Sequence, residues 1–196
     1  ADRVHGEARI VFHDPLVPEE ILALVKGKRI PVGKRSGRRS TAQHFINKQL
    51  LDAARRHDVV VRLKGGDPML FGRAHEEIEF LVGKGITVKI TPGITAALAA
   101  AADLGTSLTP RGKARSVAFV TPRLGEGTAE STWVGAALAA DTVAIYMGAD
   151  ELADIAATLI VAGKTMATPV AVVESASLPD STVTYSRLAR PRPGSR

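Results

Sequence analysis

The feature of this sequence that most limits its fold is the stretch Val59–Arg73, which reads Val-Val-Val-Arg-Leu-Lys-Gly-Gly-Asp-Pro-Met-Leu-Phe-Gly-Arg. Three consecutive valines predict a strand that is buried on both faces, as in a parallel sheet. Gly65 and Gly66 then end the strand in a turn, and a helical pattern follows Pro68. Because open α/β sheets bind ligands beyond the carboxyl ends of their strands, this turn is a candidate site. Gly-Gly-Asp alone is more often a structural turn.

Strand and helix patterns alternate along the rest of the chain. Short apolar runs that stop at glycine, proline or polar turns predict strands, and apolar residues at helical spacing predict the helices between them. This alternation predicts an α/β fold. The predicted strands are 10–12, 59–63, 86–90, 117–120, 142–147 and 169–173, and the predicted helices are the one opened by Pro18, 41–56, 74–82, 95–102, 133–140 and 150–161.

The segment 108–113 is polar and interrupted by proline and glycine, which predicts a domain boundary. The result is an N-terminal α/β domain over 1–112 and a C-terminal α/β domain over 113–196. Two local features are also predicted. The alanines of helix 95–102 should pack closely against a neighbouring element, and Asp150 should cap helix 150–161.

Small or polar residues follow the predicted strands. At the start of helix 95–102, Thr95 offers a hydroxyl beside free backbone N–H groups. If the sheets are parallel and face each other, these strand ends line one cleft. The residues at these strand ends are Asp14, Gly65-Gly66-Asp67, Pro92-Gly93-Ile94-Thr95, Met147-Gly148 and Ser175-Ala176.

The charge of the chain favours an anionic partner. Its 26 Lys and Arg exceed its 20 Asp and Glu, which gives a formal net charge of +6. The densest charge is the basic run 26–39, which holds no acidic residue. Such a run is either a solvated face or an anion-binding loop, and the glycines and serine within it favour the loop. Aromatic residues make up only 4% of the chain, which argues against the stacking of nucleic-acid bases.

Several protein classes are disfavoured by what the sequence lacks. There is no cysteine, so we expect a reducing, cytoplasmic location and no disulfides. The histidines are scattered, so no metal site is predicted, and no apolar run is long enough for a membrane span. The Gly-x-Ser-x-Gly, Gly-x-x-x-x-Gly-Lys-Ser/Thr and Gly-x-Gly-x-x-Gly motifs are also missing.

Taken together, the motifs resemble those of the tetrapyrrole methylase family in order and spacing. Arg-Leu-Lys-Gly-Gly-Asp-Pro followed by Phe-Gly-Arg is the most specific part of this signature. The resemblance covers almost the whole chain, in segments 12–17, 32–37, 60–68, 71–73, 91–97, 108–109, 145–148 and 169–174.

The resemblance implies two α/β domains with S-adenosylmethionine in the cleft between them. It also implies the reaction, in which a pyrrole carbon of uroporphyrinogen III displaces the methyl group from sulfur. The products would be precorrin-2, for sirohaem and cobalamin synthesis, and S-adenosylhomocysteine. Members of this kind are usually homodimers. We expect neither a membrane nor a nucleic acid as a partner.

The resemblance also assigns residue roles. Asp14 would be the base that removes a proton from the carbon framework of the substrate, and Lys34 its proton-donating partner. Asp67 would in addition anchor pyrrole N–H groups. The carboxylates of the substrate give the basic run, together with Arg62, a partner through charge-assisted hydrogen bonds. The implied cofactor-binding residues are Gly65, Gly66, Asp67, Leu70, Thr95, Ala96, Met147 and Ala176.

By comparison with the family, we expect the first strand and glycine loop of the N-terminal domain to be missing from this sequence, and the last strand of the C-terminal domain likewise. Two alternatives stay open. One is a methylase of the same fold that acts on a later corrinoid precursor or on ribosomal RNA. The other is a non-catalytic module that binds anions or nucleic acid.

Overall fold

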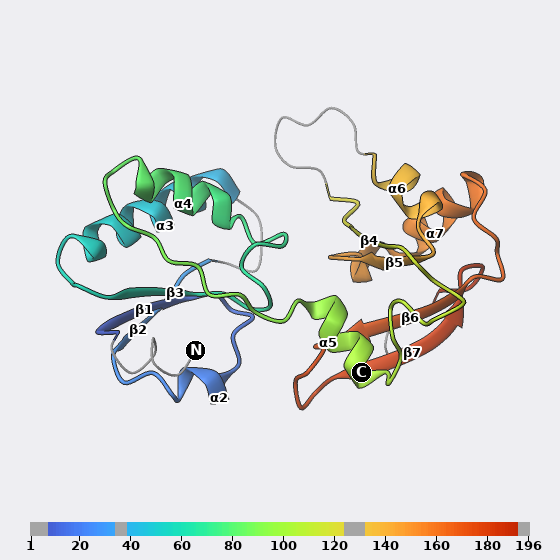
Figure 1. Cartoon of the computed structure of the whole chain (residues 1–196), viewed down its shortest axis with the longest axis horizontal. Coiled ribbons are helices and arrows are strands. Elements are labelled where there is room, and N and C mark those ends of the chain that lie inside the picture. The colour runs from blue at the N-terminus through green and yellow to red at the C-terminus, as the bar shows by residue number, and fades with distance from the viewer. Residues whose placement is uncertain (1–7, 34–38, 124–131, 192–196) are drawn as a thin grey trace. The chain divides into compact units, whose positions relative to one another are not determined.

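The computed structural model describes residues 8–33, 39–123 and 132–191, with the side chains of 39–42 excepted. The chain divides into two units, Ala1–Thr95 and Ala96–Arg196 (Figure 1). The division precedes the segment 108–113, in which the sequence predicts the boundary. Helix α5 (Ala96–Asp103) and the segment after it therefore group with the second unit.

The first unit is built on a parallel three-stranded sheet with strand order β2-β1-β3. Helices α3 and α4 lie over one face of this sheet and α2 lies on the other (Figure 1). Its strands are β1 (Ile10–His13), β2 (Lys28–Pro31) and β3 (Val60–Leu63), and its helices are α2 (Glu19–Leu22), α3 (Arg39–Ala54) and α4 (Ala74–Val82).

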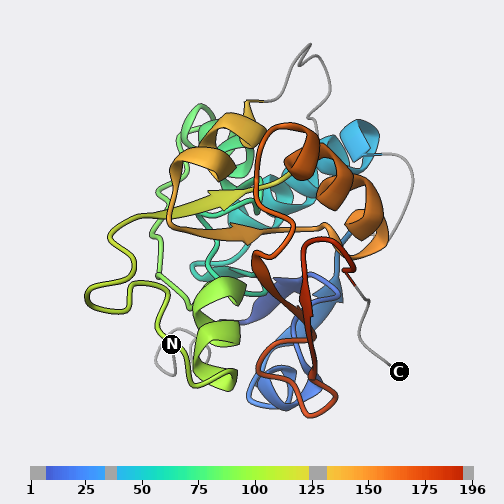
Figure 2. The same cartoon turned by 90° about the vertical axis from the view of Figure 1, so that its right-hand side faces the viewer.

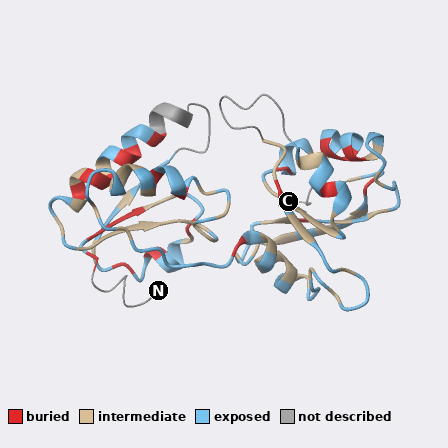
Figure 3. Cartoon of the chain, turned by 45° about the horizontal axis from the view of Figure 1, so that its top comes forward, coloured by how far each residue is buried: buried red, intermediate tan, exposed pale blue. Residues whose placement is uncertain are grey.

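The central strand of this sheet, β1, is buried on both faces. Phe12 is 2% exposed and packs with Ile46 and Leu50 of α3. Val11 points to the opposite face, where it is fully buried beside Val25. Figure 3 shows the buried residues of α3 along one side of the helix. The α/β prediction for this unit is confirmed. The prediction that the valine strand 59–63 is buried on both faces is wrong, because β3 lies at the edge of the described sheet and is only half-buried.

Two other features of the first unit differ from the sequence predictions. Strand β2 lies within the basic run and was not predicted, because its residues Lys28 and Arg29 are charged and exposed. The prediction of a strand at 86–90 is wrong, since the described residues form no strand there. A strand exists only where a neighbour accepts and donates its backbone hydrogen bonds, and apolar residues alone do not supply one.

The second unit contains two strand pairs and three α-helices among the described residues. Strands β4 and β5 are parallel, and β6 and β7 are antiparallel. Figure 2 shows β4 and β5 side by side with α6 close to them. After α5, the elements are β4 (Val117–Val120), α6 (Trp133–Ala139), β5 (Thr142–Ile145), the 3-10 helix η1 (Ala149–Glu151), α7 (Leu152–Val161), β6 (Pro169–Glu174) and β7 (Thr182–Arg187).

The core of the second unit forms where α6 and α7 meet the strands. Ala137 is fully buried and packs with Ile155 and Leu159 of α7, and Val143 and Val170 cover them. No helix in the described part of the chain is long and apolar enough to cross a membrane.

Two further predictions for this unit are wrong. Asp150 lies in η1 and does not cap α7, whose N-cap residue Glu151 makes no side-chain capping bond. None of the residues of α5 is buried, so its alanines do not mark close packing. The helix is instead tied to the unit by hydrogen bonds at its two ends, from Ala97 N to the Tyr146 hydroxyl and from Ser177 N to Asp103.

Candidate functional site

The Asp14 carboxylate lies against the glycine turn at the carboxyl end of the sheet. The parallel register places His13 beside Leu63, so β1 and β3 end at the same edge. The Asp14 amide donates to the Leu63 carbonyl over 3.3 Å. Its Oδ1 accepts from Leu16 N at 3.0 Å and its Oδ2 from Gly65 N at 3.2 Å. The fold therefore brings together Asp14 and Gly65, which are far apart in the sequence.

The close approach at this point requires glycine at position 65. A Cβ there would lie 2.7 Å from the Leu16 Cβ and 3.2 Å from the Leu16 carbonyl oxygen. The next residue, Gly66, has a φ of +75°, which side-chain-bearing residues rarely adopt. Both glycines of the predicted site are thus needed for the shape of the turn.

Asp67 joins this turn to the loop that leads to Thr95. Its Oδ1 accepts from Met69 N at 2.8 Å and its Oδ2 from Gly93 N at 3.0 Å. These two hydrogen bonds, the one from Gly93 first, lower the pKa of Asp67 below its usual value. A Cβ on Gly93 would lie only 2.3 Å from the Gly66 carbonyl oxygen. Two of the loops predicted to bind the cofactor are therefore in direct contact.

In the second unit, α5 is hydrogen-bonded to residues next to both of the other predicted cofactor residues. Tyr146, whose hydroxyl accepts from Ala97 N at 3.1 Å, directly precedes Met147. Ser177, whose amide donates to Asp103 at 2.8 Å, directly follows Ala176. Within the unit, α5 is thus bound to the loop of Met147 at its start and to the loop of Ala176 at its end.

Left-handed backbone at residues other than glycine is concentrated at the same loops. In the described part of the chain, these residues are Phe71, Arg73, Met147, Ser175 and Ser177, with φ between 52° and 66°. The first two follow Leu70, and the two serines flank Ala176. Such conformations are costly for residues with a Cβ and cluster at functional sites. The strained positions coincide with the predicted cofactor loops.

Arg62 has partners within the protein. Its side chain is 15% exposed, and it donates from Nε to Glu77 at 3.3 Å and from Nη1 to the Leu63 carbonyl at 2.8 Å. Its role toward the substrate stays a prediction.

Leu70 is half-buried and donates its amide to the Asp67 carbonyl. Lys34, the predicted partner of Asp14, lies outside the described residues, as does the basic segment 34–38.

Sequence reasoning missed a buried ion pair beside the glycine turn. Lys64 contacts both carboxylate oxygens of Glu77 at 3.1 Å, and their side chains are 7% and 6% exposed. Lys64 belongs to the Arg-Leu-Lys-Gly-Gly-Asp-Pro motif, and this membership is a signal in the sequence that could have marked it as a residue of the site. Nothing in the sequence separates Glu77 from its exposed neighbour Glu76.

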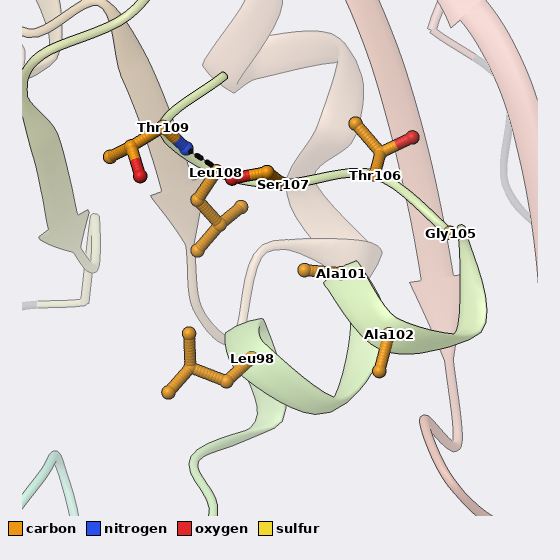
Figure 4. A pocket seen from close by; sticks show the side chains of 8 residues that line it. All are labelled: Leu98, Ala101, Ala102, Gly105, Thr106, Ser107, Leu108 and Thr109. Atoms are coloured by element: carbon orange, nitrogen blue, oxygen red, sulfur yellow. Dashed lines mark hydrogen bonds between the residues drawn. The ribbon is translucent and has the colours of Figure 1, made fainter. Parts of the chain in front are cut away.

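A cavity of about 410 Å³ lies elsewhere, at the carboxyl end of α5 (Figure 4). It is lined by small, apolar and hydroxyl side chains, without a charged group and without any of the predicted site residues. Its lining residues are Leu98, Ala101, Ala102, Gly105, Thr106, Ser107, Leu108 and Thr109. In the described ranges, no cluster of acidic or histidine side chains could hold a metal ion.

The fold and these motif-bearing loops define a class of protein. The chain belongs to the tetrapyrrole (corrin/porphyrin) methylases, whose family model matches residues 1–191. The resemblance drawn from the motifs is thereby confirmed at the level of the family.

Particular relatives narrow this class. Siroheme synthase 3 of Aeromonas hydrophila subsp. hydrophila is 43% identical over 186 residues, which are 94% of this chain and 40% of that protein. Siroheme synthase 1 of Klebsiella pneumoniae is 43% identical over 89% of this chain and 37% of its own length. The chain therefore spans well under half the length of these curated relatives.

Solved structures of tetrapyrrole methylases are similar to this chain in fold. The uroporphyrin-III C-methyl transferase of Thermus thermophilus, complexed with S-adenyl homocysteine, has a TM-score of 0.83 at 37% identity over 96% of this chain and 76% of that one. A cobalt precorrin-4 methyltransferase has a TM-score of 0.81 at 24% identity, which shows the shared fold alone.

Proposed function

We propose that the protein to which this chain belongs is an S-adenosylmethionine-dependent C-methyltransferase that converts uroporphyrinogen III to precorrin-2. The observation that carries the proposal is the junction of the Asp14 carboxylate with the Gly65 amide, next to the contact between Gly66 and Gly93. This junction assembles in one place the most specific motifs of the chain. The proposal is further supported by the similarity to a siroheme synthase and to a uroporphyrin-III C-methyl transferase.

The residues of the loops suit a cofactor with a carboxylate, an adenine and a sulfonium that apolar side chains can hold away from water. Exposed Gly66 leaves room for close approach to the backbone of the turn. Ile94 is 71% exposed and Met147 is 44% exposed. A bound ligand that removed these apolar side chains from water would be stabilised by the contact. We propose Gly65, Gly66, Asp67, Leu70, Thr95, Ala96, Met147 and Ala176 as the cofactor-binding residues.

The chain's own residues would align the substrate and move protons. S-Adenosylmethionine supplies the methyl group. Asp14, held by two backbone N–H groups on the carboxyl edge of the sheet, would accept the proton lost from the pyrrole framework. Lys34 would be the proton-donating partner of Asp14. The Asp67 oxygens each keep a lone pair beyond their present hydrogen bonds, so a pyrrole N–H can still be accepted there.

The basic run, with Arg62, would bind carboxylates of the tetrapyrrole. Lys28 and Arg29 pair with Ile10 and Val11 at the amino end of β1, away from Asp14, so we propose the cations that follow β2 for this role. We further propose a cytoplasmic homodimer that supplies precorrin-2 to sirohaem or cobalamin synthesis. Light scattering of the purified protein tests the dimer.

Two experiments test the function. Calorimetry with S-adenosylhomocysteine separates a methyltransferase from a non-catalytic anion-binding module, which would bind none. Incubation of the full-length protein with uroporphyrinogen III and S-adenosylmethionine should give a red-shifted, dimethylated product. A protein that binds the cofactor but leaves uroporphyrinogen III unchanged would instead point to a later corrinoid precursor or to RNA.

The role of Asp14 has its own test. The Asp14→Asn variant should lose turnover by about 100-fold or more, as expected for removal of a general base, with unchanged affinity for S-adenosylhomocysteine. Asp58→Asn, at an exposed position between α3 and β3, is the matched control and should leave turnover unchanged. Normal turnover in Asp14→Asn would assign the base to another residue.

A further inference from the structure

The carboxylate of Glu77 on α4 is buried and accepts hydrogen bonds from three side chains. Its side chain is 6% exposed. Its Oε1 accepts from Gln43 Nε2 at 3.1 Å, from Arg62 Nε at 3.3 Å and from Lys64 Nζ at 3.1 Å, and its Oε2 accepts a second contact from Lys64 at 3.1 Å. Glu77 is thus the centre of a polar cluster that links α3, α4 and the end of β3, and no step of the proposed reaction uses it.

The residues of β3 and the turn that Glu77 holds, Arg62 and Lys64, alternate along the chain with residues that hold Asp14. The Leu63 carbonyl accepts hydrogen bonds from Arg62 Nη1 at 2.8 Å and from the Asp14 amide at 3.3 Å. Lys64 directly precedes Gly65, whose amide donates to the Asp14 carboxylate. One side of the segment 62–65 is therefore fixed by Glu77, and its other side fixes Asp14.

Charge and packing both act on the Lys64 side chain beside Glu77. Burial and the neighbouring Arg62 guanidinium lower the pKa of Lys64, whereas the Glu77 and Asp14 carboxylates act in the opposite direction. A buried ammonium next to a guanidinium needs a fixed anion, and Glu77 supplies it. A Cβ on Gly72 would lie 3.2 Å from the Lys64 Cε, so the stem of the side chain is confined as well.

We propose that Glu77 is a positioning residue for Asp14: by holding Arg62 and Lys64, it places the Gly65 N–H so that this group orients the Asp14 carboxylate. The inference rests on the proposed function for its effect on turnover. The contact between Gly65 and Asp14 can nevertheless be measured in the absence of any reaction.

The first test uses amide NMR spectra of the full-length protein. The Gly65 amide proton should move upfield in Asp14→Asn, because it loses its carboxylate acceptor, and Glu77→Gln should move it in the same direction. The amide in place of one Glu77 oxygen would face Lys64 donor to donor, so Lys64 cannot keep its position. The Leu16 amide, which donates to the other oxygen of the same carboxylate, should also move in both variants, because the Asp14 carboxylate is reoriented in Glu77→Gln.

Two variants control this test. Glu76→Gln makes the same chemical change one residue away, at an exposed side chain that pairs with Arg73, and should leave the Gly65 resonance in place. Glu77→Asp keeps the charge and shortens the side chain, and should move the resonance less than Glu77→Gln does. If Glu77→Gln does not fold, Glu77→Asp decides. An unchanged Gly65 amide in the folded variant overturns the proposal.

The second test is a double-mutant cycle on turnover. Glu77→Gln should lower kcat by about 100-fold, as small misplacements of catalytic groups do, with an unchanged KM for S-adenosylmethionine. In the Asp14→Asn background it should have no further effect, since the two act as one unit. An additive loss would show a structural role only and overturn the proposal. Absence of methyl transfer in the unmodified protein would contradict the proposed function, whereas the NMR test would still decide the positioning role.

Discussion

Replacing Gly93 with alanine tests whether the contact between the two site loops of the first unit sets cofactor affinity. The new Cβ would lie 2.3 Å from the Gly66 carbonyl oxygen, 3.2 Å from its carbonyl carbon and 3.4 Å from the Asp67 Cα. All three are backbone atoms, so no side chain can rotate out of the way. The loops must separate by about 1 Å to regain an ordinary contact.

The size of the effect follows from this displacement. Overpacking of this kind costs about 1–3 kcal/mol, which we expect as the loss in the free energy of unfolding. The same movement stretches the 3.0 Å hydrogen bond from Gly93 N to Asp67 and shifts the loop that carries Thr95. If about 1.4 kcal/mol of this cost is lost from the free energy of binding, the dissociation constant for S-adenosylhomocysteine rises about tenfold.

Calorimetry with S-adenosylhomocysteine and urea unfolding measure the two effects. Gly135→Ala is the matched control, because position 135 lies on α6 and a Cβ there meets no atom within 4 Å. This control should raise stability by about 0.4–1 kcal/mol and leave the affinity unchanged. If Gly93→Ala keeps both the stability and the affinity of the unmodified protein, the contact between the loops has no part in cofactor binding.

Three further predictions concern stability, each measured by urea unfolding. Tyr146→Phe removes the acceptor for an amide of α5 and should cost about 1 kcal/mol. Leu50→Ala empties a site that is 3% exposed in the core and should cost about 2–5 kcal/mol. Hydrogen bonds from the Arg115 amide and then from Ser116 lower the pKa of Asp141 below its usual 3.8, so its contribution to stability is present above that pH and is lost as the pH falls through the folded-state value. Asp141→Asn should flatten this acid dependence, and an unchanged slope would contradict the assignment.

Much of the fold could be predicted because local sequence and burial agree. The apolar runs at β1, β3, β4, β5 and β6 are strands in the structure. For β1 the reason is burial, since a strand covered on both faces must be apolar along its length. Strand β2 escaped prediction because its pairing with β1 is decided by the neighbour and not by its own charged residues. The segment 86–90 shows the converse case, an apolar run without a strand partner in the described part of the chain.

For the candidate site, the sequence alone determined which residues to consider. Asp14, Gly65 and Asp67 follow apolar strands, and a parallel sheet brings such ends to one edge. The tertiary structure decided what these residues contact: Asp14 meets the Gly65 amide, and Asp67 meets the Gly93 amide. It also decided that Glu77 is buried with Lys64 while Glu76 is exposed. Residue type fixes the chemistry that a side chain can perform, whereas its partners and burial depend on segments distant in the chain that only the folded protein brings together.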